Sequence, residues 1–226
     1  APKYDFPVKH DGVYDADLDL LFSRTKELME TIRERHPLIL MEQMIVTHKK
    51  RTTVYENTNG AHFETVSGWY DVDLMYSAHE GERASSFFGS GVRTDSLERP
   101  FIELGTVERD LADVERQIDT KPLEGKFEGV AVFPPSSLGS FLGSILGNFA
   151  ADTTVLDGTS PWRNSLGEQV ADERITISAK PLDGRIVCGE RFTGEGYVSE
   201  DYDIIRAGRL ESFMLSRYVA NKTGLE

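Results

Sequence analysis

The sequence predicts an α+β protein, in which a helix packs on an antiparallel sheet and a mainly β second region follows. Apolar residues recur at helical spacing over residues 15–36, and runs rich in Val, Thr, Tyr and Phe fill residues 38–91 between turn signals. Strand-like runs return between residues 128 and 215. The chain of 226 residues is long enough to bury a sizeable core, as one large domain or two small ones.

The first half predicts two helices around a strand meander. Pro37 closes the pattern of the first helix, over residues 15–36, and a second helix is expected over residues 106–119. Between them, the turn signal "NTNG" and the glycine at position 68 divide a predicted meander of four or five strands. The apolar positions of the first helix are Leu18, Leu21, Phe22, Leu28, Met29 and Ile32.

The second half is expected to begin at a boundary within "KPLEG", residues 121–125, which gives regions 1–124 and 125–226. We expect a strand over residues 128–135, a helix from Ser136, a strand over residues 175–179, and a hairpin that turns at Ala207-Gly208. A short helix should end at Gly224. The chain lacks an initial Met and stops directly after a helical pattern, so we expect a piece of a longer protein.

Composition excludes several classes of function. A net charge of −13 and a pI near 4.9 argue against direct binding to nucleic acid or to anionic membranes. The basic run "HKKR", residues 48–51, is interpreted as a solvated strand end. A single cysteine permits no intrachain disulfide and fits a reducing compartment. No stretch approaches the ~18 consecutive apolar residues of a membrane span.

Motifs for catalysis are weak. "HEGER", residues 79–83, resembles a His-Glu-x-x-His zinc motif, but arginine cannot replace the second imidazole, so a charged turn is expected. The other four histidines have no metal-ligand spacing, and no Gly-x-Ser-x-Gly elbow is present. Cys188, in "GRIVCGE", is expected to be a small buried residue on a strand. These patterns specify no active site.

The helix from Ser136 has three glycines, Gly139, Gly143 and Gly147, at every fourth position. The apolar run is too short for a membrane dimerisation stripe, and no Gly-Lys-Ser/Thr follows to make a phosphate loop. A small-residue face that lets another backbone pack closely remains open. So does a helix that has lost functional side chains.

Three further clusters carry a family resemblance. They are "VYENTNG" at residues 54–60, "SLGEQV" at residues 165–170, and "FTGEGYVSEDYDIIRAGRLESFMLSRYVANKTGL" at residues 192–225. In this order they resemble the TldD/PmbA family, metallopeptidase-related proteins also labelled modulators of DNA gyrase. The resemblance is closer to the PmbA (TldE) side, where a Ser-Leu-Gly-x-Gln stretch and an Asp-Ile-Ile-x-x-Gly hairpin recur.

The resemblance gives the glycine helix a second meaning. In the TldD branch this helix carries His-Glu-x-x-x-His, whose histidines hold zinc while the glutamate activates water. On that register the three positions are Gly143, Ser144 and Asn148 in this chain. None of them supplies the chemistry, so no catalytic residue, no metal ligand and no cofactor is expected. The third ligand of the TldD branch, a cysteine, corresponds to a position beyond residue 226 and not to Cys188.

The resemblance therefore implies a metal-free, PmbA/TldE-like subunit of a cytoplasmic peptidase complex that acts on unfolded peptides, inactive alone. The expected partner is a zinc-bearing TldD-like subunit or a second copy, with no membrane and no direct nucleic-acid contact. Glu195 and Gly196 are candidate residues of a peptide channel. Two alternatives stay open, namely a non-enzymatic interaction protein of the gyrase-modulator type and a peptidase with unrecognised catalytic residues.

Overall fold

The computed structural model describes residues 4–5 and 8–225, which form two compact units. The helix–sheet unit comprises Phe6–Val54 and Phe63–Val132. The C-terminal unit comprises Ala1–Asp5, Tyr55–His62 and Phe133–Glu226. The predicted α+β class is confirmed, while the predicted division at residue 125 stays a prediction.

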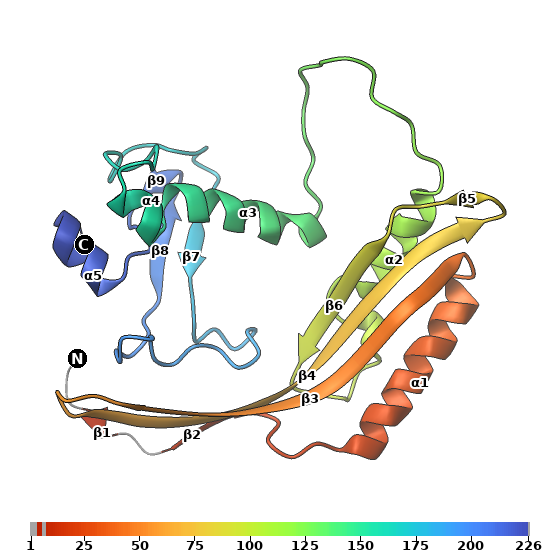
Figure 1. The fold of residues 1–226 in the computed structure, drawn as a ribbon, viewed down its shortest axis with the longest axis horizontal. Coiled ribbons are helices and arrows are strands. Elements are labelled where there is room, and N and C mark those ends of the chain that lie inside the picture. The colour runs from red at the N-terminus through yellow and green to blue at the C-terminus, as the bar shows by residue number, and fades with distance from the viewer. Residues whose placement is uncertain (1–3, 6–7, 226) are drawn as a thin grey trace. The chain divides into compact units, whose positions relative to one another are not determined.

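Helix α1 (Leu18–Arg35) is the amphipathic helix that the periodicity predicts (Figure 1). The side chain of Asp17 accepts a hydrogen bond from the Leu20 amide at 2.9 Å and caps the first turn. The helix ends at His36, directly before the proline that closes the pattern. The buried residues of α1 are Leu21, Leu28 and Ile32.

Strands β3 (Ile39–Glu56) and β4 (Ala61–Glu80) form one long hairpin, which Figure 1 shows as the two longest ribbons. The Asn57 carboxamide oxygen accepts hydrogen bonds from the amides of Asn59 and Ala61, both at 3.0 Å, and closes the predicted turn. β4 also pairs in parallel with β1 (Tyr4–Asp5) and β2 (Lys9–Gly12), and antiparallel with β5 (Arg83–Ala84) and β6 (Phe88–Thr94).

The predicted turn at Gly68 is wrong, because β4 continues through this residue. Gly68 accepts a hydrogen bond from the Val13 amide at 2.8 Å, in the segment that follows β2. A Cβ atom at position 68 would lie 1.8 Å from the Val13 carbonyl oxygen. Glycine is required here for the close approach of two backbones. In the sequence, a glycine of this kind cannot be distinguished from one that marks a turn.

The core of the helix–sheet unit lies on one face of β4. Alternate residues from Tyr70 to Ala78 are almost fully buried against α1, the 3₁₀ turn Phe101–Glu103 and α2 (Val107–Arg116). The second predicted helix is thereby confirmed, with slightly narrower bounds. The "HEGER" segment is a charged turn between β4 and β5, in which Arg83 pairs with Glu80 and Asp119.

The basic run at residues 48–51 lies in the middle of β3, so its interpretation as a strand end is wrong. His48 Nε2 lies 2.9 Å from the Val13 carbonyl oxygen, and the Lys50 ammonium lies 3.0 Å from the centre of the Tyr14 ring. His48 and Lys50 thus contact the segment that follows β2 within the same unit. Composition alone does not predict such contacts of basic side chains.

Among the described residues, the C-terminal unit contains three helices and a small antiparallel sheet of order β7-β8-β9. The predicted hairpin turns at Ala207 and Gly208, which have φ of +46° and +78°, and the last helix ends at Gly224 with φ of +71°. The elements are α3 (Pro135–Phe149), α4 (Asp152–Leu156), β7 (Ile177–Ala179), β8 (Tyr202–Arg206), β9 (Arg209–Leu210) and α5 (Arg217–Thr223). Its core residues are Ala150, Val155, Ile204, Ile205, Leu210 and Phe213.

The predicted strand over residues 128–135 is wrong. Residues 128–134 have no regular secondary structure, and Val130 and Val132 are 94% and 86% exposed. β-prone residues form a strand only where another strand pairs with them, and no described strand does so here. Among the helices of the described residues, none is long and apolar enough to cross a membrane.

Candidate functional site

Helix α3 carries the three motif positions. Gly143, Ser144 and Asn148 lie within one α-helix that buries none of its residues. The Asn148 side-chain amide donates a hydrogen bond to the Ser144 carbonyl oxygen at 2.7 Å, a contact within the same helix. A hydrogen, a hydroxyl and a neutral amide do not make a zinc site with a general base. These positions therefore do not fit the metal that the motif would hold.

The glycine face of α3 has no packing partner among the described residues. A Cβ atom added at Gly139, Gly143 or Gly147 would meet nothing within 4 Å. The close-packing interpretation of the stripe thus has no support within the part of the chain that the structure describes. The ring contacts of α3 are made by Phe141 and Phe149. The ring centre of Phe141 lies 4.1 Å from that of Phe133, which precedes the helix, and the ring centre of Phe149 lies 4.9 Å from that of Trp162.

We expect Gly143→Ala to raise the free energy of unfolding by up to about 1 kcal/mol, because alanine favours the helix and meets open space. Urea unfolding followed by circular dichroism measures the change. Gly224→Ala is the matched control of opposite sign, since Gly224 is also uncrowded but has a left-handed φ of +71°. A lower stability of Gly143→Ala would contradict the open face.

Potential metal-ligating side chains outside α3 do not gather into a site in the described part of the chain. The buried His36 lies at the end of α1, with Nδ1 3.0 Å from Glu115 Oε2 and Nε2 3.6 Å from Glu108 Oε1. The Nδ1 contact is a hydrogen bond that links the end of α1 to α2. In residues 4–5 and 8–225, no group of three or more His, Cys, Asp or Glu side chains is placed to hold a metal ion.

Glu195 and Gly196 lie in a tight turn that joins three parts of the C-terminal unit. Glu195 Oε2 accepts a hydrogen bond from the Arg217 amide at 3.0 Å, in the first turn of α5. The Arg217 guanidinium lies 5.1 Å from the centre of the Tyr197 ring. Gly196 has φ of +82°, and a Cβ atom there would lie 2.4 Å from a ring carbon of Tyr55. Both residues thus have structural contacts, and their role in a peptide channel stays a prediction.

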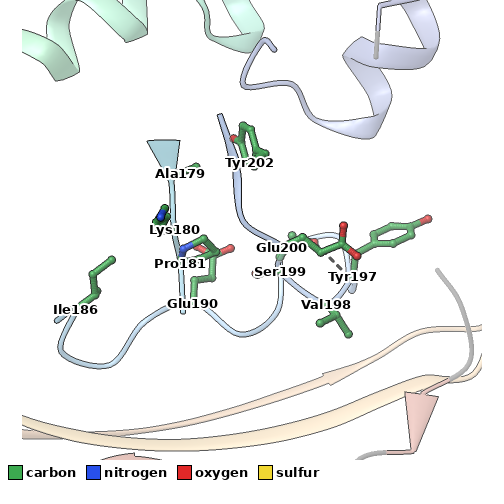
Figure 2. A pocket seen from close by; sticks show the side chains of 11 residues that line it. Ala179, Lys180, Pro181, Ile186, Glu190, Tyr197, Val198, Ser199, Glu200 and Tyr202 are labelled. Atoms are coloured by element: carbon green, nitrogen blue, oxygen red, sulfur yellow. Dashed lines mark hydrogen bonds between the residues drawn. The ribbon is translucent and has the colours of Figure 1, made fainter. Parts of the chain in front are cut away.

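A pocket of about 610 Å³ lies beside this turn, at the open end of the β7–β8 pair (Figure 2). Its polar side chains include Lys180, Glu190 and Glu200, and Tyr202 stands where β8 begins. Burial, and to a lesser extent the charge of Glu190, raise the pKa of the Tyr202 phenol, so it stays protonated at neutral pH. The remaining lining residues are Ala179, Pro181, Ile186, Thr193, Tyr197, Val198 and Ser199.

The pocket offers binding groups and no evident catalytic pair. Ser199 is buried, but among the described residues that line the pocket none is a histidine that could act as its base. Cys188 lies near the pocket's loop in a turn with φ of +55° and is partly exposed, so its predicted strand position is wrong. The glycines on either side of it, Gly184 and Gly189, are typical of such turns.

Comparison with known proteins agrees with this architecture. Residues 128–226 match the family model of the PmbA/TldA metallopeptidase C-terminal domain. A protein named "Metalloprotease" from Methanothermobacter thermautotrophicus is 33% identical over 106 residues, which cover 46% of this chain and 22% of that protein.

Two solved structures share the fold. TldE from Thermococcus kodakarensis superposes with a TM-score of 0.73 at 15% identity, covering 100% of this chain and 51% of that one. A putative modulator of DNA gyrase from Thermotoga maritima has a TM-score of 0.66 at 16% identity, covering 99% and 53%. The chain therefore spans about half the length of the structures that it matches. The family model over residues 128–226, the relative and the shared fold together support a place for this chain in the TldD/PmbA family.

Proposed function

We propose that the protein is a metal-free, TldE-like subunit of a cytoplasmic TldD/PmbA-type peptidase, and that a TldD-like partner supplies the zinc and the general base. The observation that carries the proposal is the set of residues at the motif positions. Gly143, Ser144 and Asn148 replace the two ligands and the base of a zinc peptidase helix, and Asn148 is engaged with its own helix.

A role in peptide binding is supported by the pocket of the C-terminal unit. Its walls combine aliphatic and aromatic side chains with two carboxylates and one ammonium group, a mixture that suits side chains of an unfolded peptide. The pocket lies where β7 and β8 diverge, so strand ends are available beside it. In this proposal the subunit binds and orients the peptide, while the partner carries out hydrolysis.

Reconstitution tests the proposal. The protein is purified alone, and then mixed with a TldD-like protein from the same genome that carries His-Glu-x-x-x-His. Alone, we expect substoichiometric zinc by elemental analysis after dialysis against trace zinc, and no hydrolysis of unfolded casein. The mixture should form a complex and hydrolyse casein. A partner with glutamine in place of its motif glutamate is the control, and it should bind without hydrolysis.

The open alternatives predict different results. Chelator-insensitive hydrolysis of casein by the protein alone would replace the proposal with a peptidase of unrecognised catalytic residues. Equimolar zinc that resists chelators, in the protein alone, would refute the metal-free assignment. No complex with the TldD-like protein, and no gain in hydrolysis on mixing, would favour the non-enzymatic interaction protein.

A further inference from the structure

The sheet face opposite α1 and α2 carries a cluster of cations around a buried indole. Trp69 and Asp71 alternate along β4 with core residues, so their side chains lie on the other face. Lys49 and Arg51 approach from β3, and Arg93 approaches from β6, where it stands directly opposite Asp71. We call these five residues the Trp69 cluster.

One carboxylate of the Trp69 cluster is already saturated. Asp71 accepts hydrogen bonds from Arg93 Nε at 2.8 Å and from Trp69 Nε1 at 3.0 Å, and Lys49 Nζ lies 2.8 Å from Asp71 Oδ2. The next carboxylate along this face of β4 is Asp73, which is exposed. Three cations thus lie around one committed carboxylate, in a chain whose net charge is −13.

Arg51 is the uncommitted cation of the cluster. Its guanidinium lies 5.4 Å from the centre of the Trp69 ring. The Arg93 guanidinium lies 4.8 Å from the same ring centre. Among the described residues, no carboxylate lies within ion-pair distance of Arg51, which is exposed. A guanidinium that stacks on an aromatic face still has outward N–H groups that can donate hydrogen bonds to a carboxylate. Because its side chain is already ordered, it loses little conformational entropy when it binds.

We propose that the Trp69 cluster binds the side-chain carboxylates of an extended, acidic polypeptide segment. Lys49 and Arg51 lie two positions apart on one strand, about 7 Å from each other along the chain. Alternate residues of an extended peptide have the same spacing, so a Glu-x-Glu pattern can place successive carboxylates beside them. The inference does not depend on the peptidase-subunit role, since the binding can be measured on the protein alone.

Fluorescence anisotropy of a labelled peptide tests the proposal. The probe is a blocked peptide with glutamate at alternate positions, and its glutamine counterpart is the reference. We expect saturable binding of the glutamate peptide, with an affinity that falls as the salt concentration is raised. Arg51→Gln should bind this peptide at least about fivefold more weakly than the wild type, as expected for the loss of one charge-assisted contact. Arg51→Lys should retain part of the affinity, because it keeps the charge without the fork.

Lys26→Gln is the matched control, since it also removes one positive charge from the helix–sheet unit but lies exposed on α1. It should bind the glutamate peptide like the wild type. Equal binding of the glutamine peptide, or unchanged affinity in Arg51→Gln, would overturn the proposal. Tighter binding of a single-stranded oligonucleotide than of the glutamate peptide, lost in Arg51→Gln, would overturn the assigned class of ligand.

Discussion

Gly68→Ala is expected to lower the free energy of unfolding by about 3 kcal/mol or more, at or beyond the usual cost of overpacking. The added methyl group would stand 1.8 Å from the Val13 carbonyl oxygen and 2.6 Å from its carbonyl carbon. Both are backbone atoms, so no side-chain rotation relieves the contact. The segment after β2 must move away, and the hydrogen bond from Val13 to Gly68 is lost.

Urea unfolding measures this cost, with Gly89→Ala as the control in the same sheet. At position 89 the nearest atom to an added Cβ is the Leu74 carbonyl oxygen at 3.6 Å, an ordinary contact. Gly89→Ala should therefore change the free energy of unfolding by much less than Gly68→Ala does. Similar unfolding midpoints for the two variants would contradict the close approach between Gly68 and Val13.

Asp71→Asn is expected to lower the free energy of unfolding by about 1–3 kcal/mol at pH 7, because it leaves two half-exposed cations facing a neutral amide at a buried position. Breaking one partner of such an arrangement costs more than the intact arrangement contributes. Asp113→Asn on α2 is the control. Its partner Arg116 is 78% exposed, so this change should cost about 0–1 kcal/mol.

The pH dependence of the Asp71 variant separates charge from shape. Burial alone would raise the pKa of Asp71, but hydrogen bonds from Arg93, Lys49 and Trp69 outweigh it and hold this pKa far below its usual range. A lowered pKa in the folded state stabilises the protein fully above the unfolded value of about 4, and this stabilisation is lost as the pH falls through the folded value.

The difference between wild type and Asp71→Asn should therefore stay constant from pH 8 to about pH 5 and shrink in more acidic solution. Chemical denaturation at a series of pH values measures it. A difference that is equally large at pH 2.5 and pH 7 would show that the amide perturbs packing and not charge.

The sequence predicts well those elements whose signal is local. The apolar spacing of α1 and α2, the turn at residues 57–60 and the left-handed cap at Gly224 each follow from neighbouring residues. The predictions at Gly68 and for the segment around Val130 are wrong because the conformations of these residues depend on distant partners. A glycine that admits a second backbone resembles a turn, and a β-prone segment without a pairing strand stays irregular.

The candidate site divides in the same way. The positions on α3 come from the resemblance to the TldD/PmbA family, whose motif places Gly143 and Asn148 five residues apart on one helix, and their correspondence stays a prediction. The pocket around Lys180 and Tyr202 could not be predicted, because its residues come from irregular loops without periodicity or a motif. Only the fold brings Glu190 close enough to influence the Tyr202 phenol.

The membership of the β3–β4 turn in the C-terminal unit has a consequence for synthesis of the protein. Residues Tyr55–His62 belong to the same unit as Phe133–Glu226, and the Tyr55 ring lies against Gly196. The turn is therefore translated about 70 residues before its unit begins again, a delay of about 4–14 s at ribosomal speed. During synthesis, the turn therefore waits for its contacts with residues 133–226 until the helix–sheet unit has been translated. A separately expressed 133–226 fragment would lack the turn altogether.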